Sequence, residues 1–301
     1  MIACPACGST DSNLLAILEC LCCQNKILYM NNIYYFHPNA IETFKDYSQV
    51  SLRLHYEHEN KHFWYKTRKN FILRQVTPFL SENDHFLDVG TGTAFIAKKI
   101  RELGLLVSVG DIQDYGLLER KKTDVDWLFQ FDISLEPVFV NHFDSIGLFD
   151  VIEHLNDENK IIINLRHMLK PGGKVFLTAP AYKWLWNKRD ILERHKRRYR
   201  LKGIIRKFEK NGFTVIKARY FFTGILPLLV LRTFVDKVTG LNVKESDHMN
   251  NLRINKYINS ILYYLTSLEN YLTRHLNMPI GGSIFLVAQK KETYIYGDNE
   301  A

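Results

Sequence analysis

Cysteine is missing from most of this sequence of 301 residues. All five cysteines lie within residues 4–23. Long apolar runs are missing too: the longest, from Ile225 to Leu231, ends at Arg232, well short of the ~18–20 residues that span a bilayer. The N-terminus lacks the pattern of a secretory signal. We therefore expect a cytoplasmic protein and leave a peripheral contact with a membrane open.

Neither the apolar content of 46% nor the charged content of 24% is unusual for a globular protein. Lysine and arginine, 40 in all, outnumber 32 acidic residues, so the formal net charge is +8. This excess favours an anionic partner, but it does not choose among a phosphate, a nucleic acid and a membrane face. The length suits one large domain and a smaller unit.

The cysteines form two pairs with the spacing of metal-binding knuckles. Cys4 and Cys7 make the first Cys-x-x-Cys pair and Cys20 and Cys23 the second, with Cys22 left over. Four thiolates in this pattern suit tetrahedral zinc, and a lobe this short buries too little apolar surface to fold alone. Disulfides or chance thiols are the alternatives, and Cys22 could replace either member of the second pair. The sequence thus predicts a structural zinc site.

Three regions follow one another along the chain: a cysteine lobe at 1–36, a connector and helical cover at 37–81, and an α/β domain at 82–292. In the third region strand and helix patterns alternate, which predicts a doubly wound, mostly parallel sheet with helices on both faces. The clearest helix is expected from about 157 to 169. The predicted strands are 86–89, 105–109, 125–129, 143–149, 174–179, 214–218 and 284–288.

A helical insert at about 220–280 precedes the last predicted strand. Its first part is apolar on all sides. Its second part carries a single apolar stripe, made of Ile254, Ile258, Ile261, Leu265, Leu268 and Leu272. We favour a helical cap whose stripe packs on the core. A substrate lid, a seam between two subunits and a helix on a membrane surface are the alternatives.

The stretch 86–95 has the pattern of a buried strand, a tight glycine turn and the start of a helix, which lets a backbone approach a nucleotide-like ligand. A dinucleotide fingerprint would need a third glycine where Phe95 stands, and the lysine of a Walker loop is absent. Acids are present instead. Asp88 precedes the first glycine, and Asp111 ends the next strand, where a carboxylate can accept from both hydroxyls of a ribose.

Four motifs in order resemble the class I S-adenosylmethionine-dependent methyltransferases. They are Leu-Asp-Val-Gly-Thr-Gly at 87–92, Val-Gly-Asp at 109–111, Phe-Asp-Val-Ile-Glu-His at 149–154 and Leu-Lys-Pro-Gly-Gly at 169–173. The resemblance covers about residues 84–290. It implies S-adenosylmethionine as the cofactor and a seven-stranded sheet whose last strand is antiparallel to its neighbours.

The resemblance also implies a role for each residue near these motifs. The glycine loop would hold the methionine end of the cofactor, Asp111 the ribose, and Asp132 with Ile133 the adenine. Ala94 stands where family members often carry glycine, and alanine is small enough to leave the loop intact. The cofactor residues predicted in the α/β domain are Asp88, Gly90, Thr91, Gly92, Asp111, Ile112, Asp132, Ile133 and Phe149.

A narrower resemblance is to a bacterial methyltransferase group with an N-terminal cysteine lobe similar to a zinc ribbon. Besides the cysteines, it is carried by His-Phe-Trp-Tyr at 62–65 with Arg68, and by the segment His195-x-x-Arg198-Tyr199. It implies that the helix with Trp64 and Arg68 covers the cofactor, with Arg68 near the methionine carboxylate. For Trp64, ordinary packing in the core is the alternative.

Methyl transfer to oxygen needs a base that works near neutral pH, and histidine is the usual choice. His154 follows the fourth predicted strand and His195 the fifth, so both are candidate catalytic residues. The basic run at 188–202 contains Arg198 and Tyr199, predicted to bind a phosphate or carboxylate on the acceptor. For this run a solvated surface is the alternative.

A divalent metal is a further hypothesis for the segment after the fourth strand. Asp150, Glu153 and His154 resemble the acid–histidine cluster that binds a metal in some quinone and RNA-end methyltransferases. Relatives commonly carry glutamate where Asp150 stands. An ordinary helix start, with Glu153 favouring the helix dipole, is the alternative.

These observations predict a methyltransferase that acts at oxygen or carbon of a small-molecule or lipid-linked acceptor. The apolar insert and the basic run favour an amphiphilic, anionic acceptor, and the insert could also join two subunits. The Asn/Asp-Pro-Pro-aromatic motif of many nitrogen methylators is absent after the fourth strand. An RNA methyltransferase is less favoured, because the cysteine lobe carries few Lys or Arg. A non-catalytic S-adenosylmethionine-binding scaffold is the third hypothesis.

Overall fold

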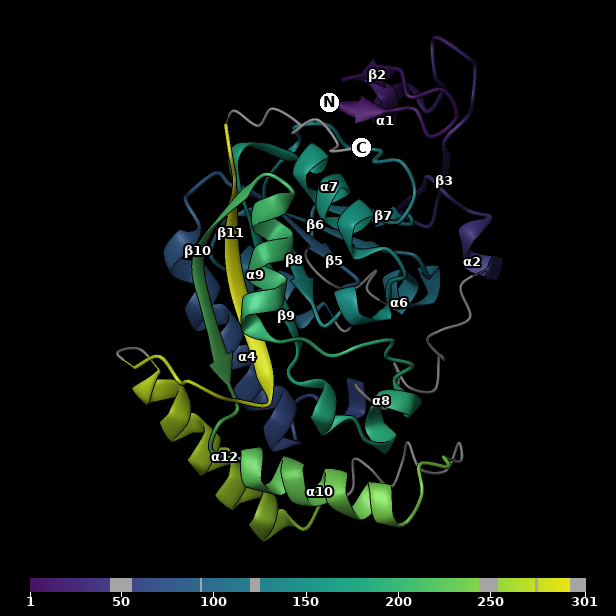
Figure 1. Ribbon diagram of the computed structural model, residues 1–301. Helices are drawn as coiled ribbons and strands as arrows, with labels where there is room; N and C mark the ends of the chain where they lie inside the picture. Colours follow the sequence, from purple (N-terminus) through teal and green to yellow (C-terminus); the bar gives the residue numbers. More distant parts are fainter. Residues whose placement is uncertain (44–55, 93, 120–124, 244–253, 274–275, 293–301) are drawn as a thin grey trace, which may run out of the picture.

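The computed structural model describes residues 1–43, 56–92, 94–119, 125–243, 254–273 and 276–292. The main strands are β3 Leu28–Met30, β4 Ile33–Tyr35, β5 His85–Val89, β6 Leu106–Asp111, β7 Trp127–Gln130, β8 Phe143–Phe149, β9 Leu169–Pro180, β10 Phe213–Phe221 and β11 Ser283–Lys290. They form one sheet in the order β10-β11-β9-β8-β5-β6-β7-β4-β3 (Figure 1). The seven predicted strands are confirmed, and β11 lies antiparallel between β10 and β9.

Two strands from the N-terminal part extend this sheet from seven strands to nine, so the predicted number was too low. β4 pairs in parallel with β7, and β3 forms a hairpin with β4. The sequence assigned both strands to the cysteine lobe. Without β4, the edge of β7 would present unpaired backbone N–H and C=O groups. The segment after the cysteines is therefore part of the main sheet.

Helices cover both faces of the sheet, as the alternating pattern predicted (Figure 1). On one face lie α7 Glu158–Met168 and α9 Leu201–Lys210, whose buried Leu165 and Phe208 share a core with β8 and β9. On the other lie α4 Phe63–Val76, α5 Phe95–Arg101 and α6 Asp114–Glu119. The shorter elements are α2 Ala40–Thr43, α8 Lys188–Leu192 and the 3₁₀ turns Thr77–Phe79, Ile152–His154 and Lys183–Leu185.

The cysteine lobe is fastened to the domain by backbone hydrogen bonds. It consists of β1 Ile2–Ala3, β2 Thr10–Asp11 and α1 Leu14–Ile17. The amide of Ala3 donates to the carbonyl of Val138 over 2.8 Å, and the amide of Val140 donates to the carbonyl of Met1 over 2.9 Å. Leu14 is fully buried in the same core as Phe139. The lobe thus shares its apolar core with the main domain.

The insert before β11 contains α10 Leu226–Val238 and α12 Lys256–Leu272. Helix α12 packs on α4 through polar side chains: Asn259 accepts a hydrogen bond from the amide of Phe63, and Asn270 donates to the carbonyl of Thr67. The predicted apolar stripe faces outward instead, with Ile261 65% and Leu268 57% exposed. The expectation that the stripe packs on the core is therefore wrong. No helix in the described ranges is long and apolar enough to cross a membrane.

We expect Gly147, in the central strand β8, to tolerate no side chain. A Cβ there would lie 2.5 Å from Cε2 of Phe149 and 2.8 Å from Cζ of Phe86. Because Phe86 is fully buried and Phe149 packs against the same core, Gly147→Ala should lower the free energy of unfolding by ~1–3 kcal/mol. Gly203→Ala on α9 is the matched control, since its Cβ would meet no heavy atom within 4 Å, and it should raise stability by ~0.5–1 kcal/mol. Equal urea midpoints for the two variants would contradict this packing.

Candidate active site

A cavity of about 550 Å³ opens at the carboxyl ends of the parallel strands, where ligands of doubly wound sheets bind. Its walls come from α4, from the loops after β5, β6 and β8, from α8, and from the insert. The structure places every predicted cofactor residue on this wall: Trp64, Arg68, Asp88, Gly90, Thr91, Gly92, Asp111, Ile112, Asp132, Ile133 and Phe149. Their contact with a cofactor stays a prediction.

The glycine loop follows β5 closely and is held by Asp88. The Thr91 hydroxyl donates to the Asp88 carboxylate over 3.0 Å, and burial raises the pKa of Asp88 to about 7. Gly90 has φ +65°, and a Cβ there would lie 2.6 Å from Cγ2 of Val151. A side chain at Gly90 is therefore excluded by both conformation and space. Ala94 adopts φ +49°, the left-handed region that suits the glycine often found there.

Asp111 ends β6 at the next position along the sheet edge. The amide of Gln113 donates to its carboxylate over 3.0 Å, while burial raises the pKa of Asp111 to about 6. Hydrogen bonds from the backbone amides of Gln113, Ile112 and Gly92 oppose this rise in pKa. The carboxylate also lines the cavity, where it can accept from hydroxyl donors. The geometry fits the predicted contact with a ribose diol.

The N-terminal segment braces the loops on the far side of Asp111. Gln130, fully buried, donates to the carbonyls of Ile112 and His37 over 3.0 Å each. The amide of Asp132 donates to Nδ1 of His37, and Asp132 accepts from the amide and hydroxyl of Ser134. The strand that joins the sheet at β4 thus fixes the predicted adenine end of the cavity. Sequence reasoning missed His37 and Gln130, which lie in no recognisable motif.

Helix α4 contributes an aromatic–arginine pair, although Arg68 is not an uncompensated cation. Nε of Arg68 lies 2.8 Å from the Asp150 carboxylate, and its guanidinium also donates to the Thr178 hydroxyl. Trp64 stacks on Phe222 with ring centroids 4.1 Å apart. The guanidinium of Arg189, in α8, lies over the Trp64 ring, 5.1 Å from its centroid, and Arg189 also lines the cavity. The basic run of the sequence contained Arg189 but gave no reason to select it.

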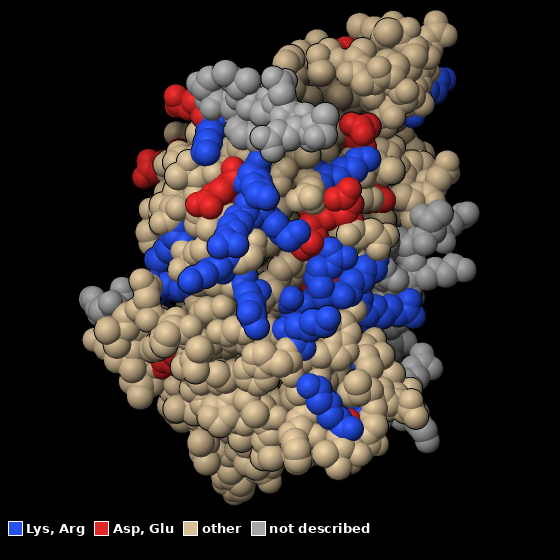
Figure 2. All heavy atoms as spheres, viewed as in Figure 1, with Lys and Arg blue, Asp and Glu red and all other residues tan. Residues whose placement is uncertain are grey.

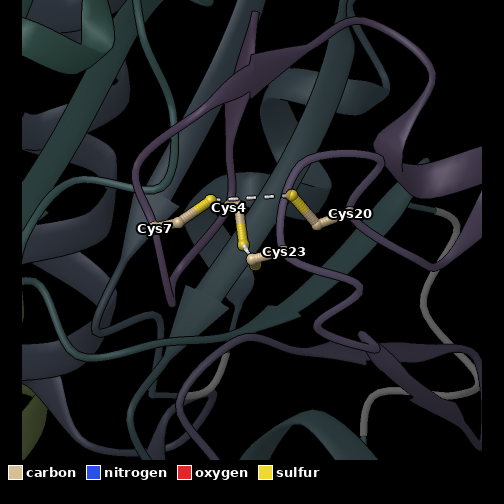
Figure 3. A group of neighbouring side chains, drawn as sticks. All are labelled: Cys4, Cys7, Cys20 and Cys23. Atoms are coloured by element: carbon tan, nitrogen blue, oxygen red, sulfur yellow. Dashed lines mark hydrogen bonds between the residues drawn. The ribbon is translucent and has the colours of Figure 1, made fainter.

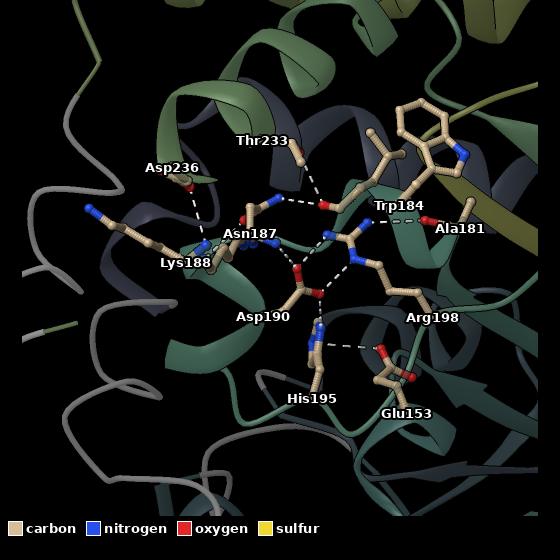
Figure 4. Close-up of polar contacts among 12 residues, drawn as sticks. Glu153, Ala181, Trp184, Asn187, Lys188, Asp190, His195, Arg198, Thr233 and Asp236 are labelled. Atoms are coloured by element: carbon tan, nitrogen blue, oxygen red, sulfur yellow. Dashed lines mark hydrogen bonds and ion pairs between the residues drawn. The ribbon is translucent and has the colours of Figure 1, made fainter. Parts of the chain in front are cut away.

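At the acceptor end, the part of the cavity where the sequence predicts that the acceptor binds, a buried carboxylate organises one of the two candidate histidines (Figure 4). Nδ1 of His195 lies 2.8 Å from Oδ1 of Asp190, which is fully buried. Arg198 donates to both oxygens of Asp190 over 2.7 and 2.9 Å, and to the carbonyl of Ala181. Although burial opposes ionisation, the hydrogen bonds from His195 and Arg198 hold the pKa of Asp190 below its ordinary value. Asp190 therefore fixes the His195 ring.

Arg198 and Tyr199 do not lie as an acceptor-binding pair. Arg198 lines the cavity, but its guanidinium is engaged by Asp190. Tyr199 is 6% exposed, belongs to the core and is not part of the cavity wall. Neighbouring side chains of an extended segment point to opposite sides, so one of the two had to face away. The prediction that Tyr199 contacts the acceptor finds no support in this geometry.

Glu153 completes the acceptor end together with the two histidines. It is fully buried, and neither carboxylate oxygen accepts a hydrogen bond from another residue that the structure describes. Burial, then the neighbouring charge of Asp150, raises the pKa of Glu153 well above its ordinary value. Donor atoms of Glu153, His154 and His195 lie within 4.8 Å of one another, and Nε2 of His195 is 3.9 Å from Glu153. We predicted from the sequence that Asp150 belongs to this cluster. In the structure Asp150 pairs with Arg68, and His195 is the third member of the cluster.

The four predicted cysteines come together in the N-terminal lobe (Figure 3). The Sγ atoms of Cys4 and Cys23 lie 3.7 Å apart, as do those of Cys7 and Cys20. Tetrahedral zinc with bonds of ~2.3 Å places its sulfur ligands about 3.8 Å apart, so the donor set fits this ion. Cys22 is exposed and outside the cluster. Of the alternatives left open by the sequence, the pair Cys20 and Cys23 is therefore the one that the fold brings together.

The sheet order, the glycine loop and the acids at successive strand ends define the Rossmann-like fold of the class I methyltransferases. A family model described as a methyltransferase domain matches residues 53–218. The chain belongs to this family of methyltransferase domains.

Curated relatives support the same assignment. The chain is similar to a malonyl-[acyl-carrier protein] O-methyltransferase of Buchnera aphidicola, with 32% identity over 114 residues, 38% of this chain and 45% of that protein. It is similar to a ubiquinone biosynthesis O-methyltransferase of Coxiella burnetii, with 26% identity over 166 residues, 53% of this chain and 58% of that protein. The chain thus spans about half the length of the curated relatives that it matches.

Solved structures agree in fold. One is the complex between the Haloferax volcanii Trm112 methyltransferase activator and a proposed methyltransferase, with a TM-score of 0.52 and 16% identity over 78% of this chain and 92% of that chain. Another is Haemonchus contortus phosphoethanolamine N-methyltransferase 2 in complex with S-adenosyl-L-methionine, with a TM-score of 0.50 and 22% identity over 74% of this chain and 52% of that chain. At these identities the likeness shows the fold alone.

The raised pKa of Asp111 predicts how cofactor binding depends on pH. Below its pKa of about 6 the side chain is neutral and loses one acceptor for the ribose hydroxyls. The affinity for S-adenosylhomocysteine should therefore be constant above about pH 7 and about tenfold lower at about pH 5. Asp111→Asn should bind ~10–100-fold more weakly at about pH 7.5 and show a shallower pH dependence. Calorimetry that finds the same affinity and pH profile for both proteins would remove Asp111 from the site.

Proposed function

We propose that the protein transfers a methyl group from S-adenosylmethionine to an oxygen atom of a small-molecule or lipid-linked acceptor. The observation that carries this proposal is His195, held by the buried Asp190, on the wall of a cavity whose other end holds the glycine loop and Asp111. Such an oriented histidine is the usual base for a hydroxyl acceptor. Both curated relatives bear names that specify O-methylation, which favours oxygen over carbon.

S-adenosylmethionine, when bound, supplies a methyl group on a positively charged sulfur. The chain has to align the acceptor, exclude water and remove a proton. With Nδ1–H of His195 donated to Asp190, the lone pair of Nε2 is available to accept the acceptor's proton. Asp190 then stabilises the imidazolium, and Arg198 keeps the carboxylate in place. Leu229 and Leu262 of the insert close the cavity with apolar surface.

The four thiolates of Cys4, Cys7, Cys20 and Cys23 would hold a structural zinc ion. Ser9 supports this assignment, because its hydroxyl lies 3.2 Å from the sulfur atoms of Cys7 and Cys20 and can donate to a thiolate. With four ligands filled, such a zinc has no open position for catalysis. Its role would be to fold the lobe that packs against the domain at Val138 and Val140.

A second candidate for the acceptor end is a divalent cation at Glu153, His154 and His195. The buried Glu153 carboxylate, without a hydrogen-bond donor from another described residue, favours it. One carboxylate and two imidazoles suit a transition metal better than Mg²⁺. This role and the base role exclude each other at Nε2 of His195, which has one lone pair.

We expect His195→Asn to lower kcat by ~10²–10⁴-fold, since the variant keeps a polar group but has no basic nitrogen. Its affinity for S-adenosylhomocysteine should stay within about twofold of the wild type, because predicted cofactor contacts lie at the other end of the cavity. His167→Asn on α7 is the matched control, being outside the cavity wall.

The assay is incorporation of labelled methyl from S-adenosylmethionine into lipid extracts, small-molecule extracts and purified RNA. Label that enters RNA alone would favour an RNA methyltransferase. Tight cofactor binding without turnover on any extract would favour a scaffold. A His195→Asn variant with full activity would refute the assignment of the base.

Metal content distinguishes the two roles proposed for His195. The purified protein should contain one zinc per chain, lost together with the folded lobe in Cys4→Ser. If His195 is the base, Glu153→Gln retains the same metal content as the wild type. If the cluster holds a cation, mass spectrometry should find a second metal equivalent that Glu153→Gln lacks, and turnover should depend on that metal.

A further inference from the structure

The insert exposes a large apolar face made by two helices. On α10 the exposed apolar side chains are Leu228, Val230, Leu231, Phe234, Val235 and Val238. On α12 they include the predicted stripe from Ile258 to Leu272 and three tyrosines spaced seven apart, Tyr257, Tyr264 and Tyr271. Contiguous apolar surface of this kind marks an interaction site on a soluble domain.

The acidic side chains of these helices are turned inward, so the apolar face is not the by-product of a loosely packed segment. Glu269, the one acid of α12, is 6% exposed and accepts from the amides of Thr223 and Gly224, at the entry to α10. Asp236, the one acid of α10, is largely buried and accepts from the amide of Lys188. Neither helix, both of which are fully described, exposes a carboxylate.

A basic band adjoins the apolar face. Exposed cationic side chains of the segment 183–206 are Lys183, Arg194, Lys196, Arg200, Lys202 and Arg206. The acids of the same segment, Asp190 and Glu193, are not exposed. Figure 2 shows Lys and Arg gathered over α8 and α9, directly beside the mostly uncharged surface of α10 and α12. The two surfaces lie on the same side of the molecule.

We propose that this side docks on an anionic lipid bilayer, with α10 and α12 lying in the interface and the basic band against the headgroups. Apolar helices with tyrosines at the water boundary and cations beside them match the chemistry of such a surface. A second copy of the chain fits less well, because it would bring another set of positive charges against the band.

The cavity continues to this face, which links docking to the proposed methyl transfer. Leu228 of α10 is 47% exposed and also lines the cavity, together with Leu229 and with Leu262 of α12. A lipid-linked acceptor could thus pass its polar end between α10 and α12 toward His195 while its apolar part stays in the bilayer. This path rests on the proposed function, but the docking itself does not.

The test is flotation of the full-length protein with vesicles of phosphatidylcholine, with or without 30% phosphatidylglycerol, in the absence of cofactor and acceptor. The double variant Phe234→Asp/Ile261→Asp replaces two side chains that are each 65% exposed and outside the cavity wall. It should lower the partition coefficient at least tenfold. Leu103→Asp, at a position 51% exposed in the turn after α5, is the matched control and should bind like the wild type.

Removing charge should act only on anionic vesicles. Lys202→Gln and Arg206→Gln should each lower binding to the phosphatidylglycerol vesicles about fivefold, which corresponds to ~1 kcal/mol per charge. Equal binding to neutral and anionic vesicles, or none to either, would overturn the proposal. So would a wild-type dimer in light scattering that the double variant converts to a monomer. Because S-adenosylhomocysteine binding is measured separately, failure of docking leaves the methyltransferase proposal standing, and the reverse also holds.

Discussion

The burial of several carboxylates at one edge of a parallel sheet is the constraint on which the rest of the site depends. Asp88, Glu153 and Asp190 are at most 3% exposed, and each needs a donor, a cation or a proton. Asp190 is satisfied by Arg198 and His195. Asp88 has Thr91 but titrates near neutrality, while Glu153 has no such donor. The compensated Asp190 and the uncompensated Glu153 both lie beside the His195 ring, one near Nδ1 and the other near Nε2.

Much of the sheet could be predicted because each strand and helix carries a local signal. The alternation from β5 to β9, the glycine loop and the acid ending β6 depend on residues close together in sequence. The pairing of β4 with β7 left no such signal, since a strand of three residues has no periodicity and the contact joins residues about 95 apart. The hydrogen bond from the amide of Asp132 to His37 could not be predicted for the same reason, since it also joins residues far apart in the sequence.

The acceptor end was predictable in its residue types and not in its pairing. His195, Arg198 and the acid at Glu153 stood out in the sequence, but their roles depend on Asp190, a residue in no motif. Asp150 was expected beside Glu153 because the segment resembles the acid–histidine cluster that binds a metal in some methyltransferases. The loop after β8 turns Asp150 to Arg68 through a left-handed backbone conformation, with φ +58°. Spacing along the chain does not reveal such a turn.

Helix α12 shows why periodicity alone could not decide the role of the insert. The apolar stripe was identified correctly, but amphipathicity does not say which side faces the protein. Here Asn259 and Asn270 bond to the α4 backbone, and Glu269 bonds to the backbone that enters α10, so the polar side supplies the specific contacts. The insert therefore has an inner surface that closes the cavity and an outer surface left apolar. A helix pair that presents both surfaces suits the proposed amphiphilic acceptor. Its inner surface lines the cavity where the polar end would react, and its outer surface would contact the same lipid that surrounds the apolar tail.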